Sequence, residues 1–220
     1  MSAACSEEQR LLGELKARRP DLEGCIPALE AAYRALRDTF AMGGKLLTCG
    51  NGGSHADAMH IVAELCKSFE RKRPLPLDFA NRLEQEPGGE ALAAHLEAGL
   101  PAITLGLNGA LKSAVENDSA LPEMAYAQEA CALLRPGDAF LAISTSGAAR
   151  NCLLAMAAAR ALGARTFALT GPHGGAMAQC ADYPIKAPGG SVKTIQEAHI
   201  ALYHALCGLV EASFFPSSAG

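Results

Sequence analysis

The sequence has no apolar run that approaches the roughly 18 residues needed for a membrane-spanning helix, so no membrane partner is expected. Its first residues are polar and acidic and lack the basic start and apolar middle of a secretory signal, which favours a cytoplasmic protein. Lysine and arginine are spread along the chain instead of clustered, and the formal net charge is -4. Direct binding of nucleic acid is therefore not expected, and an anionic substrate must be held by local groups.

None of the eight cysteines belongs to a Cys-x-x-Cys pair. The missing pairs argue against a thiolate zinc cluster and a redox dithiol, and they favour reduced, mostly structural thiols in the cytoplasm. With 220 residues the chain is long enough to bury a substantial core, and we expect one domain over residues 1–220.

Helical patterns frame the predicted domain. Two helices at about 7–19 and 25–42 form an N-terminal lead-in (7–42), which we expect to cap the sheet or to form an oligomer contact. An inserted segment at about 71–99 is predicted to form two short helices separated at Pro87-Gly88-Gly89. A long amphipathic helix is predicted at 192–214.

Strands are predicted between these helices. One follows the lead-in at Lys45, and the others are expected at 101–107, 137–143, 165–170 and 183–187. Because strand and helix alternate, the pattern predicts an α/β fold in which helices cover both faces of a parallel sheet. Pro184 indicates an edge position for the last strand. Ligands are expected at the carboxyl ends of the strands.

Two strand-to-helix turns are candidate phosphate sites. The first carries Gly50, Asn51, Gly52, Gly53 and Ser54, and the second is Ser144-Thr145-Ser146-Gly147. Backbone N–H groups and hydroxyls at the start of a helix can hold an anion. The first turn fits neither nucleotide motif, Gly-x-x-x-x-Gly-Lys-Ser or Gly-x-Gly-x-x-Gly, and alone it could be only a tight connection. Two such turns without a lysine suit one phosphomonoester.

His60 and Glu64 lie four residues apart on one predicted helix, where they can reach the same metal ion or substrate proton. A surface ion pair would produce the same pattern. Gln196 and His204 lie eight residues apart on the last helix and therefore point about 80° apart. Together the four residues form a nitrogen and oxygen ligand set that suits zinc or a similar divalent ion.

Four motifs give the sequence a family resemblance. They are Cys-Gly-Asn-Gly-Gly-Ser-His-Ala-Asp-Ala-Met-His, Ile-Ser-Thr-Ser-Gly, Leu-Thr-Gly with a following Gly-Gly, and Ile-Gln-Glu-Ala-His. In this order they resemble the phosphoheptose isomerases of the sugar-isomerase (SIS) domain superfamily. The similarity covers about residues 7–214, without the insertion.

The resemblance implies a flavodoxin-like three-layer αβα sandwich with a five-stranded parallel sheet, and a homotetramer. It also implies zinc-dependent interconversion of sedoheptulose 7-phosphate and D-glycero-D-manno-heptose 7-phosphate through an enediol. Glu64 and His204 match the family's acid/base pair, and Asn51 and Asp118 match pocket residues. The implied zinc ligands are His60, Glu64, Gln196 and His204, and the implied phosphate-binding residues are Ser54, Ser144, Thr145 and Ser146.

Three departures from the family pattern concern the substrate. Ala148-Ala149 replaces Asn-Ser and loses one hydroxyl donor, Lys193 replaces an aspartate, and Ser68 replaces an arginine. The insertion at about 71–99 is a further difference. Two alternatives follow: an isomerase of another phosphosugar, or a non-catalytic SIS protein that senses phosphosugars or binds a replication initiator. The complete metal and acid/base set favours an enzyme over the non-catalytic alternative.

Overall fold

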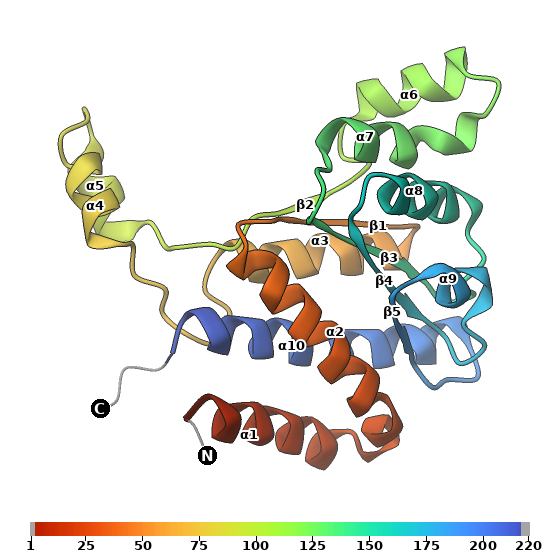
Figure 1. Ribbon diagram of the computed structural model, residues 1–220, viewed down its shortest axis with the longest axis horizontal. Coiled ribbons are helices and arrows are strands. Elements are labelled where there is room, and N and C mark those ends of the chain that lie inside the picture. The colour runs from red at the N-terminus through yellow and green to blue at the C-terminus, as the bar shows by residue number, and fades with distance from the viewer. Residues whose placement is uncertain (1–2, 217–220) are drawn as a thin grey trace.

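A five-stranded parallel sheet forms the centre of the protein in the computed structural model, which describes residues 3–216. The strands lie in the order β2-β1-β3-β4-β5 (Figure 1). Their bounds are Leu46–Gly50 for β1, Ala102–Thr104 for β2, Ala139–Ser144 for β3, Arg165–Thr170 for β4 and Tyr183–Lys186 for β5. The predicted parallel sheet is confirmed.

Helices connect the strands and cover both faces of the sheet. The helices are α1 (Ala3–Arg18), α2 (Ile26–Ala41), α3 (Gly53–Cys66), α4 (Leu77–Leu83), α5 (Gly89–His95), α6 (Gly109–Asp118), α7 (Ala125–Leu133), α8 (Arg150–Ala161), α9 (Gly175–Cys180) and α10 (Val192–Phe214). Short 3₁₀ turns at Pro20–Cys25 and Pro122–Met124 precede α2 and α7. None of the helices within residues 3–216 is long and apolar enough to cross a membrane.

Two hydrophobic cores lie on opposite faces of the sheet. Side chains alternate along a strand, so Leu141 and Ile143 of β3 join the core with α1, α2, α3 and α10, whereas Phe140 and Ala142 join the core with α7 and α8. Every residue of β3 is buried, as expected for a central parallel strand. The predicted three-layer αβα sandwich is confirmed.

Both edges of the sheet show how local chemistry ends a strand. β2 is shorter than the predicted 101–107, because the chain turns at Gly106, whose φ of +88° favours glycine. β5 forms the other edge, as Pro184 predicted. A proline cannot donate a hydrogen bond to a second neighbouring strand.

The N-terminal lead-in covers the sheet face that carries α10. α1 and α2 both pack against α10, and α2 also contacts β5. Leu15, Leu29 and Leu36 are buried in the shared core. The predicted capping role of this segment is therefore confirmed within one chain.

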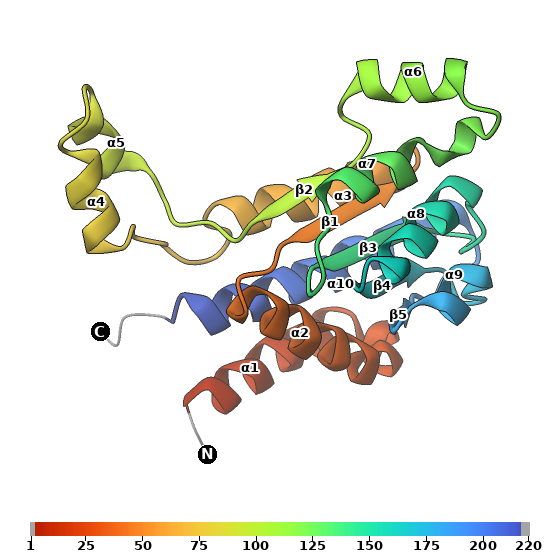
Figure 2. The same ribbon diagram turned by 45° about the horizontal axis from the view of Figure 1, so that its top comes forward.

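The inserted segment projects away from the sandwich as a hairpin of α4 and α5 (Figure 2). The two helices are separated near Pro87-Gly88-Gly89, as predicted. Arg73 anchors the base of the hairpin, where its fully buried guanidinium forms an ion pair with Glu211 of α10 at 2.8 Å. It also donates to the backbone carbonyl of Glu64 at 2.7 Å.

Candidate functional site

In the turn between β1 and α3, glycines allow neighbouring backbone and side-chain atoms to come close to the chain. Gly52 has a φ of +54°, which favours glycine. A Cβ atom at Gly50 would lie 2.4 Å from the carbonyl oxygen of Ser54, and one at Gly53 would lie 2.3 Å from Nε2 of Gln196. Side chains at these positions would therefore displace backbone or the neighbouring amide. Ser54 is buried in the first turn of α3.

A second turn with the same topology joins β3 to α8. The hydroxyls of Ser144 and Ser146 lie 3.3 Å apart, and the Ser146 hydroxyl accepts a hydrogen bond from the Ala148 N–H at 3.2 Å. Gly147 has a φ of +64°, and a Cβ atom there would lie 2.0 Å from the Gly174 carbonyl oxygen. Thr145 lies between the two serines and is partly exposed.

An asparagine pair holds the two turns together. The side-chain amides of Asn51 and Asn151 exchange two hydrogen bonds, at 2.9 and 2.8 Å. The sequence reasoning missed Asn151, which lies 100 residues from its partner and in the first turn of α8. The pair fixes the spacing of the two candidate phosphate turns.

A cavity of about 530 Å³ opens beside this asparagine pair. Its wall carries both charges, because Glu116, Glu123 and Arg150 line it together with Asn51, Ala149 and Asn151. Arg150 forms an exposed ion pair with Glu123 at 3.3 Å. Asp118 does not line this cavity: it is exposed at the end of α6 and accepts a hydrogen bond from the Asn117 side chain at 2.8 Å.

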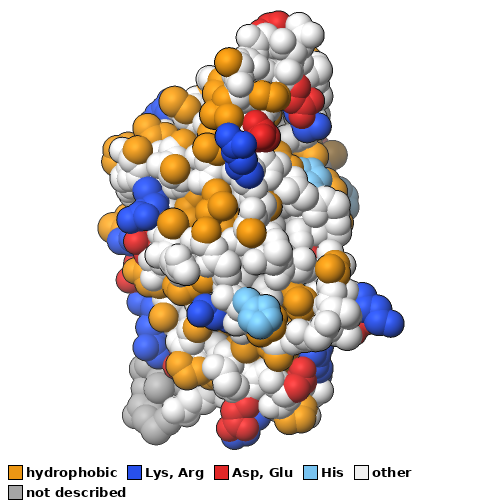
Figure 3. Space-filling view, turned by 90° about the vertical axis from the view of Figure 1, so that its right-hand side faces the viewer, with side chains coloured by type: hydrophobic (Ala, Val, Ile, Leu, Met, Phe, Trp, Pro, Cys, Tyr) orange, Lys and Arg blue, Asp and Glu red, His pale blue; other side chains and the backbone are white. Residues whose placement is uncertain are grey.

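The face of the molecule that carries these turns has mixed surface chemistry. Figure 3 views the side onto which the carboxyl ends of the strands open, and acidic and basic side chains lie scattered there among hydrophobic ones. The charge of a bound phosphate would therefore meet individual donors and helix ends instead of a broad basic surface.

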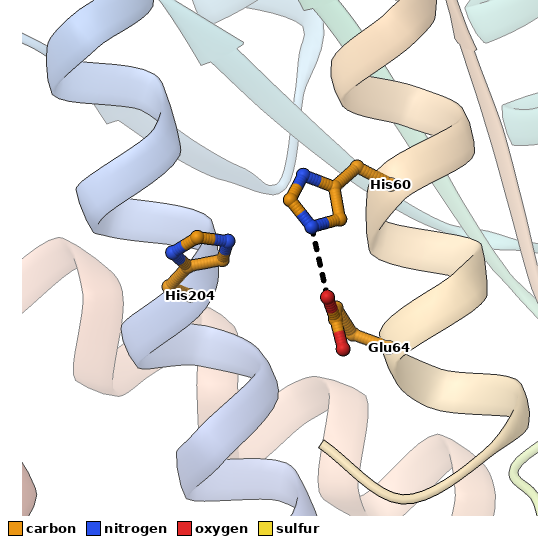
Figure 4. A group of neighbouring side chains, drawn as sticks. All are labelled: His60, Glu64 and His204. Carbon is orange, nitrogen blue, oxygen red and sulfur yellow. Dashed lines mark hydrogen bonds and ion pairs between the residues drawn. The ribbon is translucent and has the colours of Figure 1, made fainter. Parts of the chain in front are cut away.

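His60 and Glu64 of α3 meet His204 of α10 in one cluster. One ligand atom from each residue lies within 4.8 Å of the other two. Nε2 of His60 lies 2.8 Å from Oε1 of Glu64, and the two imidazole rings are 5.0 Å apart and nearly perpendicular. Figure 4 shows the three side chains pointing toward one another between the two helices.

The cluster has the properties of a divalent-metal site. Nε2 of His204 is buried and has no hydrogen-bond partner among the described residues. Burial and the nearby His60 lower the pKa of His204, which favours the neutral imidazole that can ligate. The side chain of His60 is 42% exposed and that of Glu64 16%, so an ion or substrate can reach the cluster. Two imidazoles and a carboxylate fit zinc or a similar ion.

The structure places the amide of Gln196 against Gly53, at the start of α3. Gly53 and His60 are seven residues apart, which corresponds to about 10 Å along a helix. Gln196 belongs to α10, and its amide points to the first phosphate turn. The residue thus lies on the same pair of helices, α3 and α10, as the cluster. His199, between Gln196 and His204, is fully buried and contacts the Thr170 carbonyl oxygen through Nε2 at 3.1 Å.

A further polar contact lies behind His60. Its Nδ1 is 2.9 Å from the hydroxyl of Tyr203, which donates to Oδ1 of Asp57 at 3.4 Å. Burial raises the pKa of both Asp57 and Tyr203. The sequence reasoning missed both residues. The available signal was their position, since Asp57 lies one helical turn before His60 and Tyr203 precedes His204.

Comparison with known proteins identifies the family. A phosphoheptose isomerase of Roseiflexus sp. (strain RS-1) is 36% identical over 198 residues, which cover 90% of this chain and 88% of the relative. The chain belongs to the phosphoheptose isomerase family. The SIS domain profile also matches, at residues 22–98.

Solved structures of this family have the same fold. A phosphoheptose isomerase from Francisella tularensis aligns with a TM-score of 0.71 at 28% identity, covering 96% of this chain and 98% of that chain. The enzyme from Neisseria gonorrhoeae aligns with a TM-score of 0.67 at 28% identity, covering 94% and 96%. The predicted family and SIS fold are confirmed, and the chain is an isomerase of phosphosugars. The non-catalytic alternative is thereby set aside.

Proposed function

We propose that this isomerase interconverts sedoheptulose 7-phosphate and D-glycero-D-manno-heptose 7-phosphate. The convergence of His60, Glu64 and His204 carries the proposal, because aldose–ketose isomerisation needs a base, an acid and a group that stabilises a developing oxyanion. The relatives that share most of this chain are named phosphoheptose isomerases, which supports a seven-carbon substrate.

Glu64 and His204 are the proposed acid/base pair. Starting from the aldose, a base removes the proton from C2 and an enediol forms. A proton is then delivered to C1, and the O2 proton is lost while O1 gains one, so the ketose has the same composition as the aldose. One carboxylate oxygen of Glu64 faces His60, which leaves the other free to exchange this proton.

Zinc is the proposed ion, one per chain, and His60, Glu64 and His204 would hold it. When bound, the ion would polarise the oxygens at C1 and C2. Gln196 remains the proposed fourth ligand from the family pattern. Its contact with Gly53 also supports a role in binding the substrate between the cluster and the first turn.

The phosphate is proposed to bind between the two turns. Ser54, Ser144, Thr145 and Ser146 would supply hydroxyls, and the Gly52-Gly53 backbone would allow close approach. Asn51 lines the adjoining cavity and is placed to meet sugar hydroxyls. Asp118 is proposed as a pocket residue on the family pattern, with Glu116 of the same helix already in the cavity wall.

Residues 1–220 are proposed to form one SIS domain, with the lead-in at 7–42 and the insertion at 71–99, that works in the cytoplasm as a homotetramer. The alternation of elements around one sheet and the two cores that share it support the single domain. The absence of Cys-x-x-Cys pairs from the sequence supports a reducing compartment.

Glu64→Gln tests the proposed chemistry. The substitution keeps the size and one oxygen but removes the base, so turnover of sedoheptulose 7-phosphate should fall by about 10²- to 10⁴-fold while phosphosugar binding survives. Turnover is measured together with deuterium exchange from solvent into C1 of the ketose, because an enediol route exposes a proton there, whereas C2 of the ketose carries no hydrogen.

The control is the wild-type enzyme on a panel of phosphorylated ketoses. Full exchange in Glu64→Gln would show that another residue is the base. Wild-type turnover of a different phosphoketose, without turnover of the heptulose, would replace the proposed substrate and leave the reaction class intact.

A further inference from the structure

A buried carboxylate, a tyrosine hydroxyl and a histidine form a chain behind the proposed metal site. Asp57 and Tyr203 are both buried, and the Tyr203 hydroxyl lies between Oδ1 of Asp57 at 3.4 Å and Nδ1 of His60 at 2.9 Å. The three residues come from two helices, α3 and α10, which also carry the metal cluster. The chain of contacts ends on the ring nitrogen that faces away from Glu64.

The direction of the hydrogen bonds follows from the needs of Asp57. Oδ2 of Asp57 has no hydrogen-bond partner within the described part of the chain, and Oδ1 contacts Tyr203. If the tyrosine proton pointed to His60 instead, the buried carboxylate would lose this contact, and an unsatisfied buried charge is costly. The tyrosine therefore donates to Asp57, and its oxygen accepts the Nδ1–H of His60.

This arrangement leaves Nε2 of His60 with a lone pair that points at Oε1 of Glu64. Two acceptors at 2.8 Å repel each other unless a proton or a cation lies with them. We propose that Tyr203, oriented by Asp57, is a positioning residue that holds His60 in the Nδ1–H tautomer, so that Nε2 is free to bind the divalent ion. The inference rests on the metal site proposed above.

A partner that donates or accepts at the second ring nitrogen fixes both the tautomer and the orientation of a ligating histidine. Loss of such a partner commonly weakens metal binding by about 10- to 100-fold. In this chain the direct partner of His60 is the hydroxyl of Tyr203. The carboxylate of Asp57 contacts that hydroxyl and acts on His60 only through it.

The test is the zinc affinity of Tyr203→Phe, which removes one oxygen and keeps the buried ring. Each protein is stripped with a chelator, and its affinity is measured by competition with a chromophoric chelator. We expect zinc binding weaker by about 10- to 100-fold. The absorption bands of bound Co²⁺ should also change, because the His60 ring is no longer held.

Tyr33→Phe is the matched control, because Tyr33 is also buried and its hydroxyl lies 2.8 Å from Ser213 of α10. Its zinc affinity should stay within about twofold of the wild type. Asp57→Leu should weaken zinc binding as Tyr203→Phe does, and the double variant should be no weaker than Tyr203→Phe alone, because Asp57 acts through Tyr203.

Zinc affinity of Tyr203→Phe equal to that of the wild type would overturn the positioning role and leave the metal site standing. Additive losses in the double variant would overturn the proposed order of action. A wild-type protein that binds no zinc would overturn the metal site as well, so the two failures are distinguishable. If Asp57→Leu does not fold, the comparison of Tyr203→Phe with Tyr33→Phe decides alone.

Discussion

At the scale of single residues, burial holds two histidines of α10 in their neutral form. The pKa of His204 is lowered by burial and by the neighbouring His60, and that of His199 by burial alone, against a contact with the Thr170 carbonyl that opposes the shift. His204 has a free nitrogen at the site, whereas His199 spans the interface between α10 and β4. Burial therefore keeps His204 in the form that can bind a metal ion, and it keeps His199 in the form that packs between α10 and β4.

His199 should make stability depend on pH. Its folded pKa lies below the unfolded value of about 6.5, so the unfolded chain binds a proton that the folded chain does not, and stability falls as the pH drops below about 6.5. The slope from one group is at most about 1.4 kcal/mol per pH unit. Denaturant unfolding of the metal-free protein between pH 5 and 8 measures it, and His199→Gln should flatten the curve by this amount. An unchanged slope in His199→Gln would assign the pH dependence to other groups.

The spacing within one helix predicted His60 and Glu64, and the family motifs added Gln196 and His204, whereas contacts that neither signal marks were missed. The four-residue spacing of His60 and Glu64 on one helix was enough to bring them together, because helix geometry fixes their separation. Asn151 and Tyr203 escaped notice because their partners lie more than 90 residues away in the chain. The residue type alone, an asparagine or a tyrosine on a helix, does not indicate such a contact, and for Tyr203 the available signal was its place next to His204.

At the scale of elements, a buried ion pair fixes how α3 and α10 meet. The side chains of Arg73 and Glu211 are both 0% exposed. Glu211 also accepts the backbone N–H groups of Phe69 and Glu70, and Arg73 donates to the carbonyls of Glu64 and Leu65. The pair thus ends α3 just after Glu64 and ties it to the helix that carries His204.

Arg73→Met should destabilise the protein by about 3–5 kcal/mol, because it leaves the Glu211 carboxylate buried without its cation. Replacing both partners, as Arg73→Met with Glu211→Gln, should recover part of this loss. Chemical denaturation of the metal-free protein measures both. The control is Arg82→Met in the exposed pair with Asp78, whose side chains are 68% and 72% exposed, where the cost should stay below about 1 kcal/mol. If Arg73→Met and Arg82→Met lower the free energy of unfolding equally, burial does not determine the strength of these ion pairs.

At the scale of the whole molecule, Pro184 predicted the edge position of β5, and the alternation of strands and helices predicted the sheet and its parallel direction. It did not predict the order of the other strands, because the order depends on which connections cross the sheet, and apolar runs of similar length do not encode that choice. The lead-in was expected to cap the sheet or to form an oligomer contact, and the capping is what one chain shows, because α1 and α2 pack against α10. Exposed apolar side chains also lie on α10, at Val192 and Ile200, and on the inserted hairpin.

The projecting hairpin of α4 and α5 exposes apolar side chains that a second copy of the chain would cover. Leu77 is 82% exposed, and Phe79, Leu92 and Leu96 are also exposed on the same two helices and the residue that follows them. Helices of seven residues are marginal in water without a packed face, and a cluster of exposed apolar groups marks an interface. We therefore predict that the proposed homotetramer is built partly through this hairpin.

Light scattering at micromolar concentration should give about four times the mass of one chain for the wild type. Leu77→Asp combined with Phe79→Asp should lower that mass and leave the monomer folded, because both side chains lie outside the cores. The control is Met42→Asp, which changes another exposed apolar residue, outside the hairpin and at the end of α2, and should leave the mass unchanged. A wild-type mass of one chain would refute the tetramer. If both the hairpin variant and the control remain tetrameric, the hairpin is not the interface, and other residues make the contact between chains.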